Sequence, residues 1–285
     1  MRHTSLLTLC LTGVLALSAC QKSGDAAVNK SLKDLNVIDE SNLSSIMLTA
    51  ADPAEAVTYF RKASADNPER LDLQRGLAKS LVRAKRPTEA LSVWNKVIAN
   101  PKSTNADRVD LAEAYIRTGS WKKAKTTLDT VPPTHETYKR YRLEAMVADS
   151  NKQWKKSDSF YETAMGLTTN PGSVLNNWGY SKLTRGDFKG AEQMFTEALS
   201  YDSKLFTAKN NLVLARGAQR NYVLPVIQMT QIERAKLLHT LALSAIKQGD
   251  VATGKGLLKD AIDTHPQHFE AAVTSLAALE NNVSN

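Results

Sequence analysis

One segment near the C-terminus has the residue spacing of a phosphate-binding loop. Residues 249–256 match the pattern GxxxxGK[ST] at every position except the last. A loop of this kind follows a β-strand, surrounds the phosphates with backbone N–H groups and ends in a hydroxyl that holds Mg²⁺. Here Gly256 replaces the hydroxyl, and residues 237–246 before the loop have the apolar spacing of a helix. The sequence therefore argues against nucleotide binding, and we expect no cofactor and no small-molecule substrate.

Two histidines come closest to a metal site. His265 and His268 flank Pro266 in an expected connection between helices, and no third ligand follows nearby. Zinc sites in proteins need three or four ligands, so exposed loop histidines are the better interpretation and we expect no metal. No nucleophile, histidine and acid stand at a recognisable spacing, which favours a protein that is not an enzyme. A triad scattered through the fold is left open by a single sequence.

The N-terminus has the pattern of an export signal. Arg2 precedes an apolar stretch over residues 6–17, which is too short to cross a bilayer as a stable helix. This predicts a signal peptide over residues 1–19. Residues 17–20, Leu-Ser-Ala-Cys, resemble the lipobox of bacterial lipoproteins, and the resemblance implies that Cys20 carries a lipid. An ordinary secretory signal with a chance cysteine is the alternative.

The lipoprotein resemblance also implies a location. In that family an aspartate after the cysteine tends to retain the protein in the inner membrane, so Gln21 favours the outer membrane. Residues 20–40 have mixed polarity and no sustained helical stripe, which predicts a lipidated cysteine followed by a flexible tether with a reach of about 25 Å. We therefore expect a lipid-anchored protein of the outer membrane that faces the periplasm.

The composition limits the remaining classes of function. The two cysteines, Cys10 and Cys20, both lie in the N-terminal region, so the expected folded body has neither disulfides nor thiolate metal sites. The net charge of +8 is a modest excess that favours acidic partners or anionic lipids, and a solvated basic surface explains it equally well. We expect no nucleic-acid partner.

A repeat of about 34 residues organises the rest of the chain. Each copy has a small residue, a large residue four positions later and a small or aliphatic residue three positions after that, all on one helical face. Such a repeat predicts pairs of helices that stack on their neighbours, with the repeated aromatic residues in the core. The copies are Ala56-Phe60-Ala63, Ala90-Trp94-Val97, Ala124-Leu128-Val131, Ser157-Tyr161-Ala164, Ala191-Phe195-Ala198 and Gly254-Leu258-Ala261.

Turn residues support the same register. Gly119, Gly186 and Gly249 stand where a left-handed residue is expected between two helices, and the weakest unit has Lys152 there instead. Prolines follow the second helix of four units, at positions 68, 101, 171 and 266. The pattern resembles the tetratricopeptide repeat over most of residues 41–280. The resemblance implies an all-α solenoid of about six to seven helix pairs, with regular repeats over residues 41–221.

The last two copies are 63 residues apart, which marks an interruption. Counting one repeat from Ala191 reaches Pro225, which cannot lie inside a regular helix. Thr230 and Glu233 then form a capping-box pattern that opens a new helix. We therefore expect an irregular segment over residues 222–229, followed by a C-terminal repeat and cap over residues 230–282.

The tetratricopeptide resemblance also implies which residues line a partner-binding groove, because the first helix of each unit faces the concave side. Asparagines recur there at a spacing of 34, and their amides suit a peptide backbone because they donate and accept together. An asparagine merely tolerated on an exposed face is the alternative, as is a solvated face for the basic residues. The implied positions are Asn176, Asn177, Tyr180, Asn210, Asn211, Arg75, Lys79, Arg83, Arg117, Lys139 and Arg142.

Together these features predict a protein-binding scaffold. The layout of repeats and the segment at residues 224–230 resemble the tetratricopeptide lipoproteins of tight-adherence (Flp) pilus assembly, the TadD family. The resemblance implies a secretin or other pilus assembly component as the partner. A scaffold for outer-membrane barrel insertion or for cell-wall enzymes is the alternative in the same class. A lipoprotein enzyme is the alternative of another class, although the repeats leave no room for a separate catalytic domain.

Overall fold

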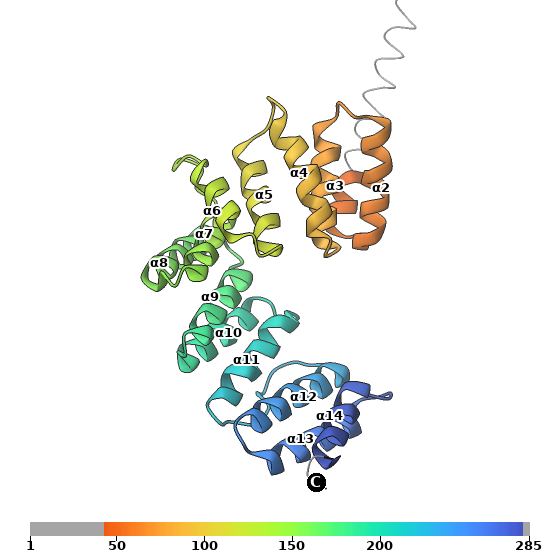
Figure 1. The fold of residues 1–285 in the computed structure, drawn as a ribbon, viewed down its shortest axis with the longest axis vertical. Coiled ribbons are helices and arrows are strands. Elements are labelled where there is room, and N and C mark those ends of the chain that lie inside the picture. Colours follow the sequence, from red (N-terminus) through yellow and green to blue (C-terminus); the bar gives the residue numbers. More distant parts are fainter. Residues whose placement is uncertain (1–42, 282–285) are drawn as a thin grey trace, which may run out of the picture. The chain divides into compact units, whose positions relative to one another are not determined.

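The computed structural model describes residues 43–281, and every regular element in that range is a helix (Figure 1). Fourteen helices occur there, a short one over residues 43–49 and then α2 to α14. The predicted all-α helical repeat array is therefore confirmed. The predicted signal peptide, Cys20 and the tether to residue 40 lie outside the described residues. The chain divides into two compact units between Ser103 and Thr104.

The first unit holds the helix at residues 43–49 and three longer helices, α2, α3 and α4. Helix starts follow local chemistry: Asp52 Oδ1 accepts a hydrogen bond from the Ala54 backbone N–H at 2.8 Å, and prolines 53 and 87 occupy first helical positions. Phe60 and Trp94 are the largest buried side chains of this unit. The bounds are α2 Pro53–Asp66, α3 Leu71–Arg83 and α4 Pro87–Ala99.

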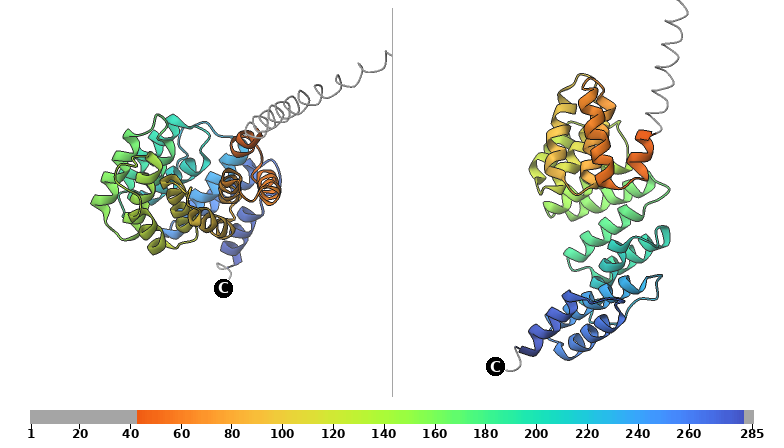
Figure 2. Two further views of the ribbon diagram at one scale, coloured as in Figure 1. Left: turned by 90° about the horizontal axis from the view of Figure 1, so that it is seen from above. Right: turned by 90° about the vertical axis from the view of Figure 1, so that its right-hand side faces the viewer.

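The second unit holds ten helices, which pack mainly against their neighbours in sequence, as a repeat array requires. Figure 2 shows the helices from green to blue following one another in chain order. The bounds are α5 Asn105–Arg117, α6 Trp121–Asp129, α7 Tyr138–Ser150, α8 Trp154–Gly166, α9 Gly172–Thr184, α10 Phe188–Tyr201, α11 Phe206–Ala218, α12 Gln231–Lys247, α13 Val251–Thr264 and α14 Glu270–Asn281.

The repeat triplets form the core in both units. Every member is buried except Ala63, which is half-buried. The small residues allow close helix contact: a Cβ atom on Gly179 would lie 2.7 Å from Phe195 Cε1. Glycine therefore lets α9 and α10 approach until the Phe195 ring lies against the α9 backbone.

The turns between helices adopt the expected conformation. Gly119, Gly186 and Gly249 have φ angles of 72°, 86° and 84°. Lys152, which stands at the same place in the weakest unit, has φ 56°, so the register fixes the turn even where glycine is missing. The turn glycine and the buried Gly254 also account for the loop-like spacing of residues 249–256, which follow helix α12 and not a strand.

The interruption after α11 is an irregular segment that takes the place of a helix. No helix occurs between Ala218 and Gln231, and the segment buries Leu224 and Ile227 partly against neighbouring helices. The capping box at the start of α12 is formed as predicted. Thr230 Oγ1 accepts from the Glu233 N–H at 3.2 Å, and Glu233 Oε2 accepts from the Thr230 N–H at 2.8 Å.

Candidate functional site

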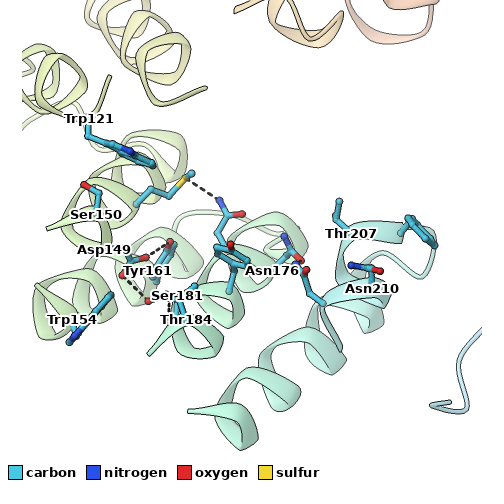
Figure 3. Close-up of a pocket in the computed structure, with 15 residues that line it drawn as sticks. Trp121, Asp149, Ser150, Trp154, Tyr161, Asn176, Ser181, Thr184, Thr207 and Asn210 are labelled. Atoms are coloured by element: carbon cyan, nitrogen blue, oxygen red, sulfur yellow. Dashed lines mark hydrogen bonds between the residues drawn. The ribbon is translucent and has the colours of Figure 1, made fainter. Parts of the chain in front are cut away.

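The second unit contains a pocket of about 530 Å³ between the first helices of successive repeats (Figure 3). Helices α7, α9 and α11 supply most of its wall. Helix α6 contributes one aromatic residue, and α8 contributes two. All five polar positions predicted on α9 and α11 line this pocket: Asn176, Asn177, Tyr180, Asn210 and Asn211. They meet because a spacing of one repeat places equivalent residues side by side on adjacent first helices.

The asparagines also link neighbouring repeats. Asn211 Nδ2 donates to Asn176 Oδ1 at 3.1 Å, which connects α11 to α9. Asn210 Oδ1 accepts from Thr240 Oγ1 at 2.8 Å, and Asn177 Nδ2 lies 3.3 Å from Met146 Sδ. Each of these amides is half-buried and uses one of its polar atoms inside the protein. A purely solvent-facing position for the asparagines is therefore wrong.

Aromatic rings form the opposite end of the pocket. Trp121 and Trp154 lie at this end (Figure 3). Tyr180 on α9 also lines the pocket and has 54% of its surface exposed.

The prediction that the aromatic members of the triplets are core is confirmed, because Phe60, Trp94, Tyr161 and Phe195 are at most 1% exposed. Trp121, which belongs to no triplet, is 37% exposed. Trp121 is the first residue of α6, directly after a turn, so its side chain lies at the edge of the helix pair and not between the helices.

A half-buried carboxylate lies at the aromatic end of the pocket. Tyr161 Oη donates to Asp149 Oδ2 at 3.0 Å, and Ser181 Oγ donates to Asp149 Oδ1 at 2.7 Å. Burial raises the pKa of the Tyr161 hydroxyl well above its usual value, and the neighbouring Asp149 raises it further. Tyr161 therefore stays protonated and acts here as a hydrogen-bond donor that fixes the carboxylate.

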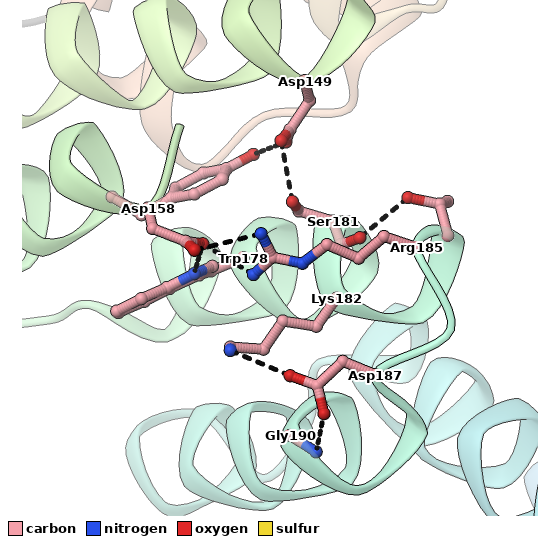
Figure 4. A network of polar contacts seen from close by, with 10 residues as sticks. Asp149, Asp158, Trp178, Ser181, Lys182, Arg185, Asp187 and Gly190 are labelled. Atoms are coloured by element: carbon pink, nitrogen blue, oxygen red, sulfur yellow. Dashed lines mark hydrogen bonds and ion pairs between the residues drawn. The ribbon is translucent and has the colours of Figure 1, made fainter. Parts of the chain in front are cut away.

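A second polar network holds α9 in place outside the pocket (Figure 4). Asp158 on α8 accepts from Trp178 Nε1 at 2.6 Å and from Arg185 Nη2 at 2.7 Å. Partial burial alone would raise the pKa of Asp158, but these two donors outweigh it and lower the pKa. Lys182 on α9 pairs with Asp187 at 3.1 Å, and Arg185, the residue after α9, lies 5.9 Å from the centroid of the Trp154 ring while it pairs with Asp158.

The predicted basic stripe lies on α3 in the first unit. Arg83 donates to the backbone oxygens of Met47 and Ala51, both at 2.9 Å, so its guanidinium ties the helix at residues 43–49 to α3. Arg75 donates to Lys102 O at 3.1 Å, while Lys79 is exposed. This gives Arg83 a structural role, and partner binding by the stripe stays a prediction.

The predicted basic residues of α5 and α7 do not line the pocket. Lys139 contacts Asp110 and lies 2.6 Å from Glu113 Oε2, and Arg117 lies 2.6 Å from the other oxygen of Glu113. Burial would raise the pKa of Glu113, but the two cations outweigh it and lower the pKa to about 2. These charges therefore compensate one another between α5 and α7. Arg142 Nη1 lies 3.4 Å from Ser173 Oγ.

Sequence reasoning missed the aromatic half of the pocket. Trp121 and Trp154 belong to second helices, which the family pattern does not assign to the groove. Met146 and Asp149 lie on α7, about one and two turns beyond Arg142, the last residue predicted on that helix. The pair Met146 and Ser150, four residues apart on a first helix, was a usable signal, whereas nothing local marks the two tryptophans.

Two further observations bear on chemistry. The residues that the structure describes contain no group of three or more His, Cys, Asp or Glu side chains arranged to hold a metal, and His268 pairs with Glu270 at 2.7 Å. Across residues 43–281, none of the helices combines the length and the apolar character that a membrane span needs.

Comparisons with known proteins agree with the repeat architecture. A tetratricopeptide repeat family model matches residues 47–104. No curated protein sequence matches the chain. Among solved structures, a tetratricopeptide repeat protein from Parabacteroides merdae is 13% identical with a TM-score of 0.55, over 84% of this chain and 96% of that chain.

Two other solved structures share the fold. A chain of the APC/C hetero-tetramer Cut9–Hcn1 is 13% identical with a TM-score of 0.59 over 83% of this chain; only 48% of it is covered, so this chain spans about half its length. PilW, described as a type IV pilus biogenesis factor, is 14% identical with a TM-score of 0.53, over 72% of this chain and 98% of that chain. At these identities the likeness shows the fold alone. Residues 43–281 therefore form a tetratricopeptide-type helical repeat array.

Proposed function

We propose that the protein is a lipid-anchored scaffold of the bacterial envelope that holds an extended segment of a partner protein in the pocket between α7, α9 and α11. The observation that carries this proposal is the convergence of the five predicted groove positions on one pocket of about 530 Å³. Asparagines with one polar atom fixed inside the protein are pre-oriented, which reduces the entropy lost when a ligand binds.

The partner belongs to an envelope assembly system, in this proposal the tight-adherence pilus. The support is the lipobox-like sequence at residues 17–20, the repeat layout and the segment at residues 224–230. PilW, a pilus biogenesis factor, uses the same fold, although the identity of 14% does not carry a shared role by itself. The protein works by binding in this proposal, and no catalytic step is assigned to it.

Site-specific photo-cross-linking in the native host tests the pocket. p-Benzoyl-phenylalanine in place of Tyr180 should give an adduct with an envelope protein, whereas the same group in place of Tyr201 should not. Tyr201 is the matched control because it is also an exposed tyrosine of the second unit, 49% against 54% exposed, and does not line the pocket. The same adducts from both positions, or none from position 180, would remove the pocket from the proposal.

Mass spectrometry of the adduct tests the pilus assignment. A secretin or another pilus assembly component supports it, and a barrel-insertion factor or a cell-wall enzyme contradicts it.

The anchor is tested separately with Cys20→Ser. This variant should lose metabolic labelling by palmitate and move from the membrane to the soluble or unprocessed fraction. Normal processing and firm membrane attachment of the variant would show that Cys20 does not carry the anchor.

A further inference from the structure

The pocket is free of cations in a chain that is rich in them. The sequence contains 37 lysines and arginines, yet none is among the described residues that line the pocket. Two cations lie beside the rings that line it. Arg185 is 5.9 Å from the centroid of the Trp154 ring and is paired with Asp158, and Lys236 is 5.9 Å from the centroid of the Phe206 ring on α11. Because lysine and arginine are the strongest partners for a carboxylate, the aromatic end, where the nearby Arg185 is already paired, disfavours an acidic side chain or a C-terminal carboxylate.

One acidic residue strengthens that selectivity. Asp149 lines the aromatic end of the pocket, and its two oxygens accept from Tyr161 and Ser181, which holds the carboxylate in place. An acidic ligand group at this end would lose its hydration and meet a like charge. The charge of the pocket therefore complements a neutral or basic ligand.

The asparagine end presents hydrogen-bonding groups of both kinds. Asn176 and Asn210 use their Oδ1 atoms inside the protein, and within residues 43–281 their Nδ2 atoms make no hydrogen bond. Asn211 uses its Nδ2 atom and keeps its Oδ1 atom available within the same residues. Donors and acceptors on adjacent helices match the alternating C=O and N–H groups of an extended backbone.

The aromatic end offers a place for one large apolar side chain. Met146, Trp121 and Trp154 line it, and Figure 3 shows the pocket residues spread from these tryptophans to Thr207 and Asn210. Aromatic and thioether surfaces favour apolar or aromatic groups, and buried side chains of this kind dominate the energy of most recognition sites. Phe206 adds a further aromatic ring beside Thr207 on α11, and an elongated arrangement of this kind suits a chain segment.

We propose that the pocket selects an extended protein segment that has a large apolar anchor side chain and no carboxylate. The anchor lies against Trp121, Met146 and Trp154, and the backbone after it runs along the asparagines of α9 and α11. This inference rests on the proposed scaffold function and adds the chemistry of the segment that the scaffold binds.

A displayed library of short random segments, flanked on both sides by flexible linkers, tests this selectivity with the full-length protein in detergent. The enriched segments should share a large apolar residue and contain fewer acidic residues than the starting library. A synthetic peptide of the enriched sequence, capped at both ends, should lose about tenfold or more in affinity when its anchor is changed to Asp, because about 1.4 kcal/mol is a factor of ten.

Pocket variants show whether the peptide binds at the proposed place. Trp121→Ala should weaken peptide binding by about tenfold, the effect of losing one aromatic contact. Tyr180→Ala should also weaken peptide binding. Because Tyr180 is exposed and lies on another helix, this variant replaces Trp121→Ala as the test if Trp121→Ala does not fold. Tyr201→Ala is the matched control and should bind as the unchanged protein does.

Several results would overturn the inference. The library would contradict it by enriching acidic segments or by enriching none. The peptide would contradict it by binding equally well with an Asp anchor, or by binding all pocket variants with equal affinity. Chitotriose binding that depends on Trp121, with no enriched peptide, would assign the pocket to a glycan instead. If position 180 gives an adduct in the cell but the library enriches acidic segments, the scaffold function is supported and only this selectivity is contradicted.

Discussion

Glu113→Gln tests the charged cluster that joins α5 to α7. Glu113 is held between Lys139 and Arg117, with Nζ and Nη2 each 2.6 Å from a carboxylate oxygen. Its pKa is about 2 where 4.5 is usual, which corresponds to about 3 kcal/mol of stabilisation at neutral pH, since one pKa unit is worth about 1.4 kcal/mol. The free energy of unfolding of the variant should be about 2–3 kcal/mol lower at pH 7, because Gln cannot carry the charge that the two cations stabilise.

The pH dependence follows from the direction of the shift. A carboxylate whose pKa is lowered in the folded protein contributes fully above its unfolded value of 4.5, and the contribution falls as pH drops towards 2. In urea unfolding, the difference in the free energy of unfolding between the unchanged protein and Glu113→Gln should therefore shrink to about 1.5 kcal/mol near pH 3. A difference that stays the same at pH 7 and pH 3 would show that the carboxylate charge is not the cause.

Asp129→Asn is the matched control. Asp129 pairs with Lys125 at 2.7 Å, but both side chains are more than half exposed. Exposed pairs contribute about 0.5 kcal/mol or less, so this variant should unfold almost as the unchanged protein does. A loss as large as that of Glu113→Gln would mean that burial does not distinguish the two pairs.

The remaining predictions concern the repeat core. Gly179→Ala should destabilise the protein by about 1–3 kcal/mol in chemical unfolding, because its Cβ would lie 2.7 Å from Phe195 Cε1, whereas Gly166→Ala meets no atom within 4 Å and should be neutral or slightly stabilising. Equal effects of the two would contradict the close-approach argument. Ser157→Ala should stabilise by about 1 kcal/mol, because the Ser157 hydroxyl is fully buried and makes no hydrogen bond within residues 43–281; a lower melting temperature would refute this.

The helices and their core could be predicted because their signals are local. The capping box of Thr230 and Glu233 depends on residues three positions apart, and the triplets depend on helical periodicity within one segment. Even the strained turn at Lys152 follows from the repeat register, which identifies the position although the residue type does not.

The aromatic end of the pocket could not be predicted in this way. Whether Trp121 faces the core or the pocket depends on how α6 packs against α7. That packing is determined by residues far apart in sequence. The cluster of Glu113 and Lys139 joins side chains of different helices, so their spacing carries no recognisable period. The basic residues were therefore assigned to the groove by the family pattern, although several of them are held by carboxylates or backbone oxygens.

The pocket asparagines connect ligand binding to the stability of the array. Asn211 bonds to Asn176 and Asn210 bonds to Thr240, so the same amides that would contact a ligand also join α9, α11 and α12. In repeat proteins, stability comes largely from such contacts between neighbours. A segment bound across these helices adds further contacts between the same repeats, and by linkage it stabilises the folded state by about 2.7 kcal/mol at a hundred times its dissociation constant. In the proposed binding mode, one set of side chains would therefore both align the repeats and present donors and acceptors to a partner.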